Sequence, residues 1–133
     1  MPKILIADDD VAVRNLIRLL LERVGYAVAE AGSGEQTIEM ATSEDPGLIL
    51  LDIVMPGIGG IEALRRLKAD PATADIPVVV LSAQHEIVLV KECVELGASD
   101  YLGKPCRDGW LLTTVKEILE ISSHDYAFTG TQG

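Results

Sequence analysis

The sequence predicts an α/β protein in which a five-stranded parallel sheet is flanked by helices on both faces. Short runs of continuously apolar residues recur along the chain, which is typical of strands buried on both faces. Between these runs lie stretches in which apolar residues repeat at helical spacing. Strand and helix thus alternate five times within 133 residues, and this order predicts a single three-layer sandwich with right-handed crossovers.

Each predicted strand is an apolar run that ends near a polar residue or a glycine. In chain order the runs cover residues 3–8, 26–31, 48–52, 78–82 and 100–103. The second run is weaker than the others, and the fifth is very short. The third leads into a loop, residues 53–60, that contains three glycines.

The predicted helices are marked by apolar stripes and by the residues that stop them. They cover residues 11–24, 34–44, 61–69, 85–96 and 107–121. Gly25 and Gly97 stop the first and fourth helices, and Asp45-Pro46 stops the second. The stripe is lost from Ser122 onward, so residues 122–133 are predicted to form a tail or the start of a linker.

The composition is that of an acidic globular protein, with 48% apolar residues and a formal net charge of -10. An acidic surface repels phosphate backbones, which argues against direct nucleic-acid binding. No apolar stretch approaches the ~20 residues that span a bilayer, so membrane insertion is not expected. Cys93 and Cys106 lack metal-ligand spacing, and reduced thiols in a cytoplasmic protein are their expected state.

Polar side chains stand at the ends of four predicted strands. Asp8 and Asp9 end the first, Asp52 the third and Ser82 the fourth, and Lys104 follows the fifth. Ligands of open parallel sheets bind outside the carboxyl ends of the strands, so these side chains should converge. Three carboxylates would repel one another without a cation among them, and Mg²⁺ prefers oxygen ligands. The set therefore suits a divalent cation and a phosphoryl group.

Each of these residues also has a simpler interpretation. The three consecutive aspartates could cap the following helix, but capping explains one of them, and we assign that role to Asp10. Asp52 could be an ordinary polar strand end, or a nucleophile that forms an aspartyl phosphate. Lys104 could be a solvated lysine, or it could neutralise phosphoryl charge. Ser82 could begin a helix, or it could donate to a phosphoryl oxygen.

Together these residues resemble the receiver domain of two-component response regulators. The resemblance covers about residues 3–121 and rests on four motifs in matching order. The motifs are Ile4-Leu5-Ile6-Ala7-Asp8-Asp9-Asp10, Leu50-Leu51-Asp52-Ile53-Val54-Met55-Pro56-Gly57, Val79-Val80-Leu81-Ser82-Ala83 and Tyr101-Leu102-Gly103-Lys104-Pro105. The resemblance implies a flavodoxin-like, doubly wound sheet in the order 2-1-3-4-5, with residues 1–121 as the receiver domain.

The resemblance implies that Asp52 accepts a phosphoryl group from a sensor histidine kinase or a histidine phosphotransfer protein. Ser82 and Lys104 would hold the phosphoryl oxygens, and Ser82 with Tyr101 would form the switch. The chain would catalyse only its own phosphorylation and dephosphorylation. Its output would be altered binding to a downstream target protein or to a second copy of itself.

The same resemblance implies a site for Mg²⁺ or Mn²⁺. Asp8, Asp9 and Asp52 would supply carboxylate ligands, with Asp9 the more direct ligand of the acidic pair. The backbone carbonyl of Val54 would complete the protein's share. Two positions depart from the family pattern: Gly59 stands where an aspartate usually precedes the next helix, and Cys106 stands where a bulky apolar residue is common. Glycine is tolerated as an N-cap but is a weaker cap than aspartate, so we expect the loop after Asp52 to be more mobile.

Two contact surfaces are also predicted. The fourth helix carries more apolar residues than one buried stripe needs, so we expect output through this helix, the fifth strand and the fifth helix. The resemblance implies that a phosphotransfer domain docks at the opposite edge of the site. That edge comprises Ala12, Arg14, Leu16, Arg18, Pro105 and Cys106. For Arg18, a solvated face is an equally good interpretation.

Two other functions stay open at this point. A phosphatase of the haloacid-dehalogenase type also combines a strand-end Asp, a Ser or Thr and a Lys with magnesium. Its Asp-x-Asp-x-Thr/Val motif is incomplete at Ala12, however, and no acidic pair follows Lys104. The other alternative is a receiver-like interaction module that works without phosphorylation. The presence of all five site residues argues against this module.

Overall fold

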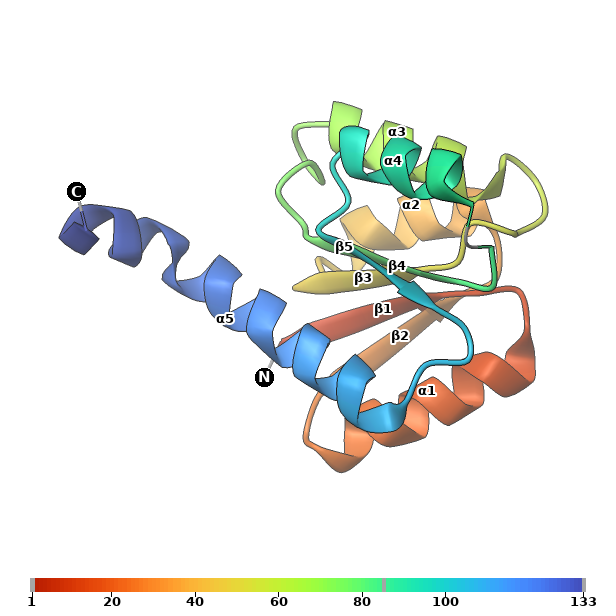
Figure 1. The fold of residues 1–133 in the computed structure, drawn as a ribbon, viewed down its shortest axis with the longest axis horizontal. Helices are drawn as coiled ribbons and strands as arrows, with labels where there is room; N and C mark the ends of the chain where they lie inside the picture. Colours follow the sequence, from red (N-terminus) through yellow and green to blue (C-terminus); the bar gives the residue numbers. More distant parts are fainter. Residues whose placement is uncertain (1, 85, 133) are drawn as a thin grey trace.

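The computed structural model describes the backbone of residues 2–84 and 86–132 and the side chains of residues 2–84 and 86–121. A five-stranded parallel sheet forms its middle layer (Figure 1). The strands are β1 (Lys3–Ala7), β2 (Ala27–Ala31), β3 (Leu48–Leu51), β4 (Val78–Ser82) and β5 (Asp100–Gly103). Their order in space is β2-β1-β3-β4-β5, which confirms the predicted order.

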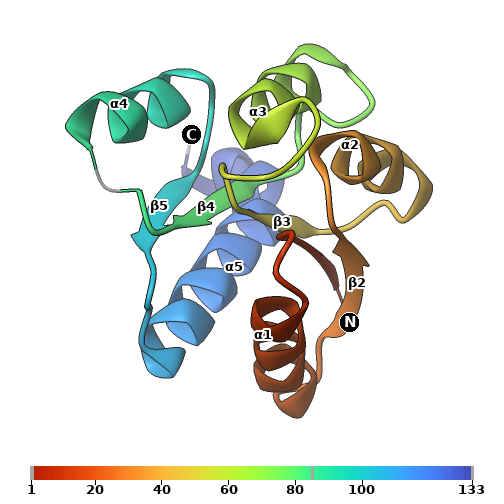
Figure 2. The same ribbon diagram turned by 90° about the vertical axis from the view of Figure 1, so that its right-hand side faces the viewer.

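Helices cover both faces of the sheet, as predicted. In the described part of the chain they are α1 (Val11–Arg23), α2 (Gly34–Ser43), α3 (Gly59–Ala69), α4 (Ile87–Glu95) and α5 (Asp108–Gln132). α1 and α5 lie on one face, and α2, α3 and α4 lie on the other (Figure 2). His85, the predicted start of the fourth helix, lies outside the described residues. No helix within the described residues is long and apolar enough to cross a membrane.

The sheet supplies two cores because successive residues of a strand point to opposite faces. In β1, Leu5 and Ala7 belong to the core beneath α2, α3 and α4, whereas Ile4 and Ile6 belong to the core beneath α1 and α5. Every residue of β3 and β4 is buried, which explains their continuously apolar sequences. β2 lies at an edge and is only partly buried, which accounts for its weaker signal.

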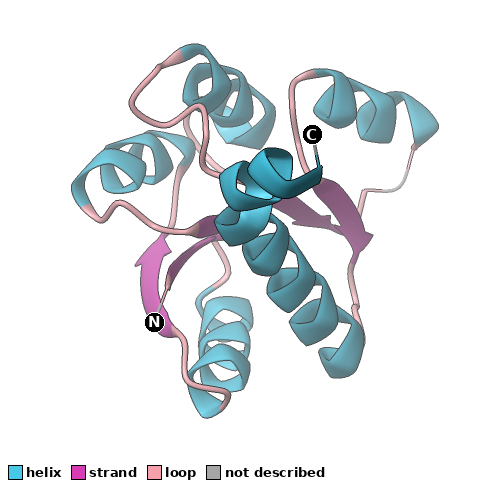
Figure 3. Ribbon diagram, turned by 90° about the vertical axis from the view of Figure 1, so that its left-hand side faces the viewer, coloured by secondary structure: helices cyan, strands magenta, loops and turns pink. Residues whose placement is uncertain are grey.

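The end of α5 differs from the prediction. The apolar stripe ends before Ser122, but the helix continues to Gln132, and its last part projects away from the sheet (Figures 1 and 3). An apolar stripe marks the helix face that packs on a core, and a helical segment that leaves the core does not need one. The predicted helix end at residue 121 is therefore wrong. The role of the following residues as a tail or linker stays a prediction.

Candidate functional site

The site lies where the carboxyl ends of β1, β3, β4 and β5 meet. Backbone hydrogen bonds continue from the strands into the site residues. The Asp8 N–H donates to the Ala31 carbonyl (3.0 Å), the Asp52 N–H to the Ala7 carbonyl (2.9 Å) and the Lys104 N–H to the Ser82 carbonyl (2.9 Å). These bonds satisfy the backbone and fix the points from which the functional side chains project.

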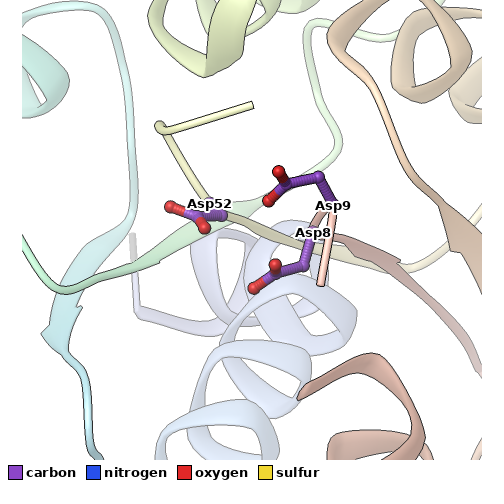
Figure 4. A group of neighbouring side chains, drawn as sticks. All are labelled: Asp8, Asp9 and Asp52. Carbon is purple, nitrogen blue, oxygen red and sulfur yellow. The ribbon is translucent and has the colours of Figure 1, made fainter. Parts of the chain in front are cut away.

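Asp8, Asp9 and Asp52 form the acidic cluster that the sequence predicted (Figure 4). One carboxylate oxygen from each residue lies within 4.8 Å of those of the other two. Asp8 and Asp52 are buried, and Asp9 is exposed. Three oxygens at this spacing, open to solvent on the Asp9 side, suit a small hard cation such as Mg²⁺.

Lys104 joins the two buried carboxylates. Its Nζ donates to Asp8 Oδ2 (2.5 Å) and to Asp52 Oδ2 (3.0 Å). Burial by itself lowers the pKa of the Lys104 ammonium, but the hydrogen bonds and charges of Asp8 and Asp52 outweigh it, so the net pKa lies above the ordinary value. One ammonium against three carboxylates leaves an excess of negative charge, which also fits a divalent cation.

The β1–α1 loop is held by side chains that belong to the loop itself. Asp8 Oδ1 accepts from the Asp10 N–H (2.9 Å). Asp10 Oδ1 accepts from the N–H groups of Ala12 (2.9 Å) and Val13 (3.2 Å) at the start of α1. This confirms Asp10 as the N-cap and separates its role from that of the acidic cluster.

Arg14 supports the same loop from α1, a role that the sequence analysis missed. Its Nη1 donates to the Asp8 carbonyl (2.6 Å), and its Nε donates to Glu30 Oε1 (3.0 Å). Arg18 Nη1 donates to the other oxygen of Glu30 (2.6 Å). The sequence did offer a clue to this role in Glu30, because an acidic residue within a strand that faces a helix needs a cationic partner. Arg14 therefore positions the backbone next to the acidic cluster.

The β3–α3 loop follows Asp52 and is built differently. Asp52 Oδ1 accepts from the Val54 N–H (3.0 Å). The Gly60 N–H donates to the Ile53 carbonyl (3.1 Å), and a Cβ at Gly60 would overlap with the backbone of Asp52 and Ile53. The first turn of α3 thus packs directly against the backbone that follows β3. The Val54 side chain is half exposed, and the role of its carbonyl as a metal ligand stays a prediction.

The start of α3 differs from the prediction. Gly59, the expected N-cap, is the first helical residue, with φ +82, and Ile58 occupies the cap position. Ile58 makes no side-chain capping hydrogen bond. The helix begins two residues earlier than expected because a left-handed glycine lets the chain turn directly into it.

Ser82 and Tyr101 contact the same residue. Ser82 is fully buried, and its Oγ accepts from the Gln84 N–H (3.1 Å). The Tyr101 hydroxyl donates to the Gln84 carbonyl. Burial raises the pKa of Tyr101. Ser82 ends β4, well before α4 begins, so the structure places it at the strand end rather than at a helix start. Gln84 is the link between the two predicted switch residues.

An apolar cleft of about 360 Å³ lies beside Lys104, between α1 and α5. Leu16, Pro105 and Cys106 line it together with residues of the core beneath α1 and α5. Three of the six residues predicted for phosphotransfer docking therefore lie together. Arg14, by contrast, is turned towards Asp8 and Glu30.

Residues 4–116 match the response regulator receiver domain family. The chain belongs to this family. It is 40% identical over 116 residues to the phosphate regulon transcriptional regulatory protein PhoB of Pseudomonas aeruginosa, a match that covers 87% of this chain and 51% of that protein. It is 35% identical to sporulation initiation phosphotransferase F of Bacillus subtilis, a match that covers 92% of this chain and 97% of that protein.

The fold comparison agrees with the sequence comparison. A CheY-like response regulator receiver domain protein from Methanospirillum hungatei superimposes with a TM-score of 0.89 at 26% identity, covering 94% of this chain and 98% of that one. The chain spans about half the length of several curated relatives that it matches. These matches support the receiver prediction and lend nothing to the haloacid-dehalogenase alternative.

Family membership carries a general role. Receiver domains are signalling modules rather than enzymes in the usual sense; they bind Mg²⁺ at an acidic pocket and interact with histidine kinases or phosphotransferases. Asp8, Asp9 and Asp52 form such an acidic pocket in this chain.

Proposed function

We propose that this chain accepts a phosphoryl group on Asp52 and thereby changes its affinity for other proteins. The observation that carries the proposal is the position of the Asp52 carboxylate, which lies 3.0 Å from the Lys104 ammonium and within the acidic cluster. A carboxylate is a competent nucleophile towards phosphorus, and an adjacent ammonium can stabilise the charge that develops on the phosphoryl oxygens.

In the proposed reaction, an Asp52 oxygen forms a bond to phosphorus while the phosphorus–nitrogen bond of a phosphohistidine breaks. The histidine nitrogen keeps the electron pair of that bond. Lys104 exchanges its contact with Asp52 for one with a phosphoryl oxygen, and the Val54 N–H holds the other oxygen of Asp52 in place. Mg²⁺ or Mn²⁺ held by Asp8, Asp9, Asp52 and the Val54 carbonyl would supply further positive charge to the phosphoryl group.

The proposed donor is a sensor histidine kinase or a histidine phosphotransfer protein. The apolar cleft between α1 and α5 supports this choice, because it opens beside Lys104 and carries Leu16 with 59% of its surface exposed. An apolar surface next to a reactive group is suited to the docking of a helical partner.

The proposed output begins at Ser82. A phosphoryl oxygen that accepts a hydrogen bond from the Ser82 hydroxyl would draw Oγ away from the Gln84 N–H, and the Gln84 carbonyl in turn accepts from the Tyr101 hydroxyl. Movement of Gln84 would reach α4, where Ile87 and Val88 are 82% and 76% exposed. We propose that this surface binds a downstream target protein or a second copy of the chain, without direct nucleic-acid contact by residues 1–121.

The proposal also covers the domain limits, the reactions and the compartment of the chain. Residues 1–121 act as the receiver domain, and residues 122–133 act as a tail or linker. The chain catalyses only its own phosphorylation and dephosphorylation, and the cytoplasm is its compartment.

The test is phosphoryl uptake by wild type, Asp52→Asn and Asp10→Asn with acetyl phosphate and Mg²⁺, followed by intact mass. Asp10→Asn is the matched control, because it removes one carboxylate near the site while asparagine can still cap α1. We expect one phosphoryl group on wild type and on Asp10→Asn, and none on Asp52→Asn. Uptake by Asp52→Asn at the wild-type rate would show that Asp52 is not the acceptor.

A further inference from the structure

The loop that follows Asp52 lacks a capping side chain of its own. The Ile58 N–H stands at the entry to α3, where backbone donors need an acceptor from outside the helix. Glu35, in the first turn of α2, provides it: the Ile58 N–H donates to Glu35 Oε1 (3.2 Å). An acid from another helix thus binds Ile58, the residue just before Gly59, where the family usually has an aspartate.

The loop is shaped to receive the Glu35 carboxylate. Gly57 has φ +77, and a Cβ on it would overlap with both carboxylate oxygens of Glu35. Gly34 packs beneath the same loop, where a Cβ would lie 2.7 Å from the Gly59 carbonyl oxygen and from Ile58 Cγ1. The start of α2 therefore forms the surface on which the loop rests.

The near end of this loop is fixed at the site. The Val54 N–H is bonded to Asp52 Oδ1, and the Ile53 carbonyl accepts from Gly60. Only residues 55–57 separate Val54 from Ile58, where Glu35 acts. A displacement of Ile58 is therefore separated by only three residues from the backbone of Val54, whose N–H bonds to the Asp52 carboxylate.

We propose that Glu35 is a positioning residue for the Asp52 loop and that it sets the Mg²⁺ concentration at which the chain is phosphorylated. The proposal rests on the proposed function. Glu35 acts through its hydrogen bond to Ile58 rather than through its charge, because an exposed carboxylate is well screened by solvent.

Three variants separate the hydrogen bond from the charge. Glu35→Ala removes both, and Glu35→Gln keeps an acceptor oxygen without the charge. Glu39→Ala removes another exposed carboxylate one turn further along α2. Two quantities are measured for each: the Mg²⁺ concentration for half-maximal uptake from acetyl phosphate, and hydrogen exchange at the Ile58 amide.

For Glu35→Ala we expect the half-maximal Mg²⁺ concentration to rise about fivefold and exchange at Ile58 to accelerate by a similar factor, as for the loss of one ordinary hydrogen bond. Glu35→Gln should stay within about twofold of wild type, and Glu39→Ala should match it. The proposal is overturned if Glu35→Ala behaves like Glu39→Ala, or if Glu35→Gln behaves like Glu35→Ala. If the wild type took up no phosphoryl group, the proposed function would fail. Exchange at Ile58 and Mg²⁺ binding by calorimetry would then still decide the role of Glu35.

Discussion

The two loops that flank the acidic cluster are stabilised in different ways. In the β1–α1 loop, the side chains of Asp8 and Asp10 bond to backbone groups only two or three residues away. In the β3–α3 loop, positive-φ glycines shape the chain, and its Ile58 N–H is bonded to Glu35 on another helix. Both loops have local hydrogen bonds, but only the first has its own side-chain cap for the helix that follows, whereas the second takes an acceptor from α2.

This difference matters because each loop presents part of the same site. The β1–α1 loop carries Asp8 and Asp9, and the β3–α3 loop begins at Asp52. Lys104 bonds to a carboxylate from each side. Because one loop caps its own helix and the other takes an acceptor from α2, the two sides of the site should respond unequally to mutation.

Lys104→Met should have the largest effect because it removes the contact common to both loops. We expect uptake from acetyl phosphate to slow by about a hundredfold or more, as when a preorganised charge at a reaction centre is lost. The measurement is the rate of intact-mass change in Mg²⁺. Lys116→Met, an exposed lysine on α5, is the control and should leave the rate unchanged.

The same variant gives a pH dependence with a definite sign. The pKa of Lys104 in the folded chain lies above its ordinary value of 10.5, so the ammonium stabilises the fold fully below that pH. The stabilisation should be lost as pH rises through the higher folded-state pKa. Urea unfolding of wild type and Lys104→Met should show a stability difference that is constant from pH 7 to about 10 and shrinks above 10.5. A difference that grows with alkaline pH would contradict the pairing.

Gly57→Ala should have the next largest effect and isolates the distant contact. The left-handed backbone and the displacement of Glu35 together should lower the free energy of unfolding by about 2 kcal/mol. Gly59→Ala is the matched control, since Gly59 has a similar φ of +82 but nothing within 4 Å of an added Cβ. Urea titration should show the smaller loss for Gly59→Ala. Equal losses would mean that the Glu35 contact contributes nothing.

Arg14→Met should have the smallest effect of the three and tests support of the first loop. Loss of its charged hydrogen bond to the Asp8 carbonyl should lower the free energy of unfolding by about 1.5 kcal/mol. Arg18→Met, which loses only partly exposed ion pairs with Glu22 and Glu30, should cost about 0.5 kcal/mol or less. Thermal melts of the two variants compare them directly. Similar losses would indicate that Glu30, rather than the Asp8 carbonyl, is the important partner.

Local sequence determined much of this protein. Strands β3 and β4 can be predicted directly from the sequence, because both of their faces are buried and their residues are therefore continuously apolar. The Asp10 cap can equally be predicted from the sequence, because the two N–H groups that donate to its carboxylate lie within three residues of it. The convergence of Asp8, Asp9, Asp52 and Lys104 followed from a general property of parallel sheets, whose strand ends share one edge.

Only the tertiary structure decided the contacts between elements that are distant in sequence. Arg14 turns towards Asp8 because β2 places Glu30 beside α1, and the sequence alone does not say which surface a helical arginine faces. Glu35 reaches Ile58 because α2 and α3 pack side by side on one face of the sheet. α5 continues past its apolar stripe, which shows that the stripe marks only the part of a helix that packs against the core. Periodicity and capping reflect local geometry and burial, whereas the partner of a polar side chain depends on which elements the fold brings together.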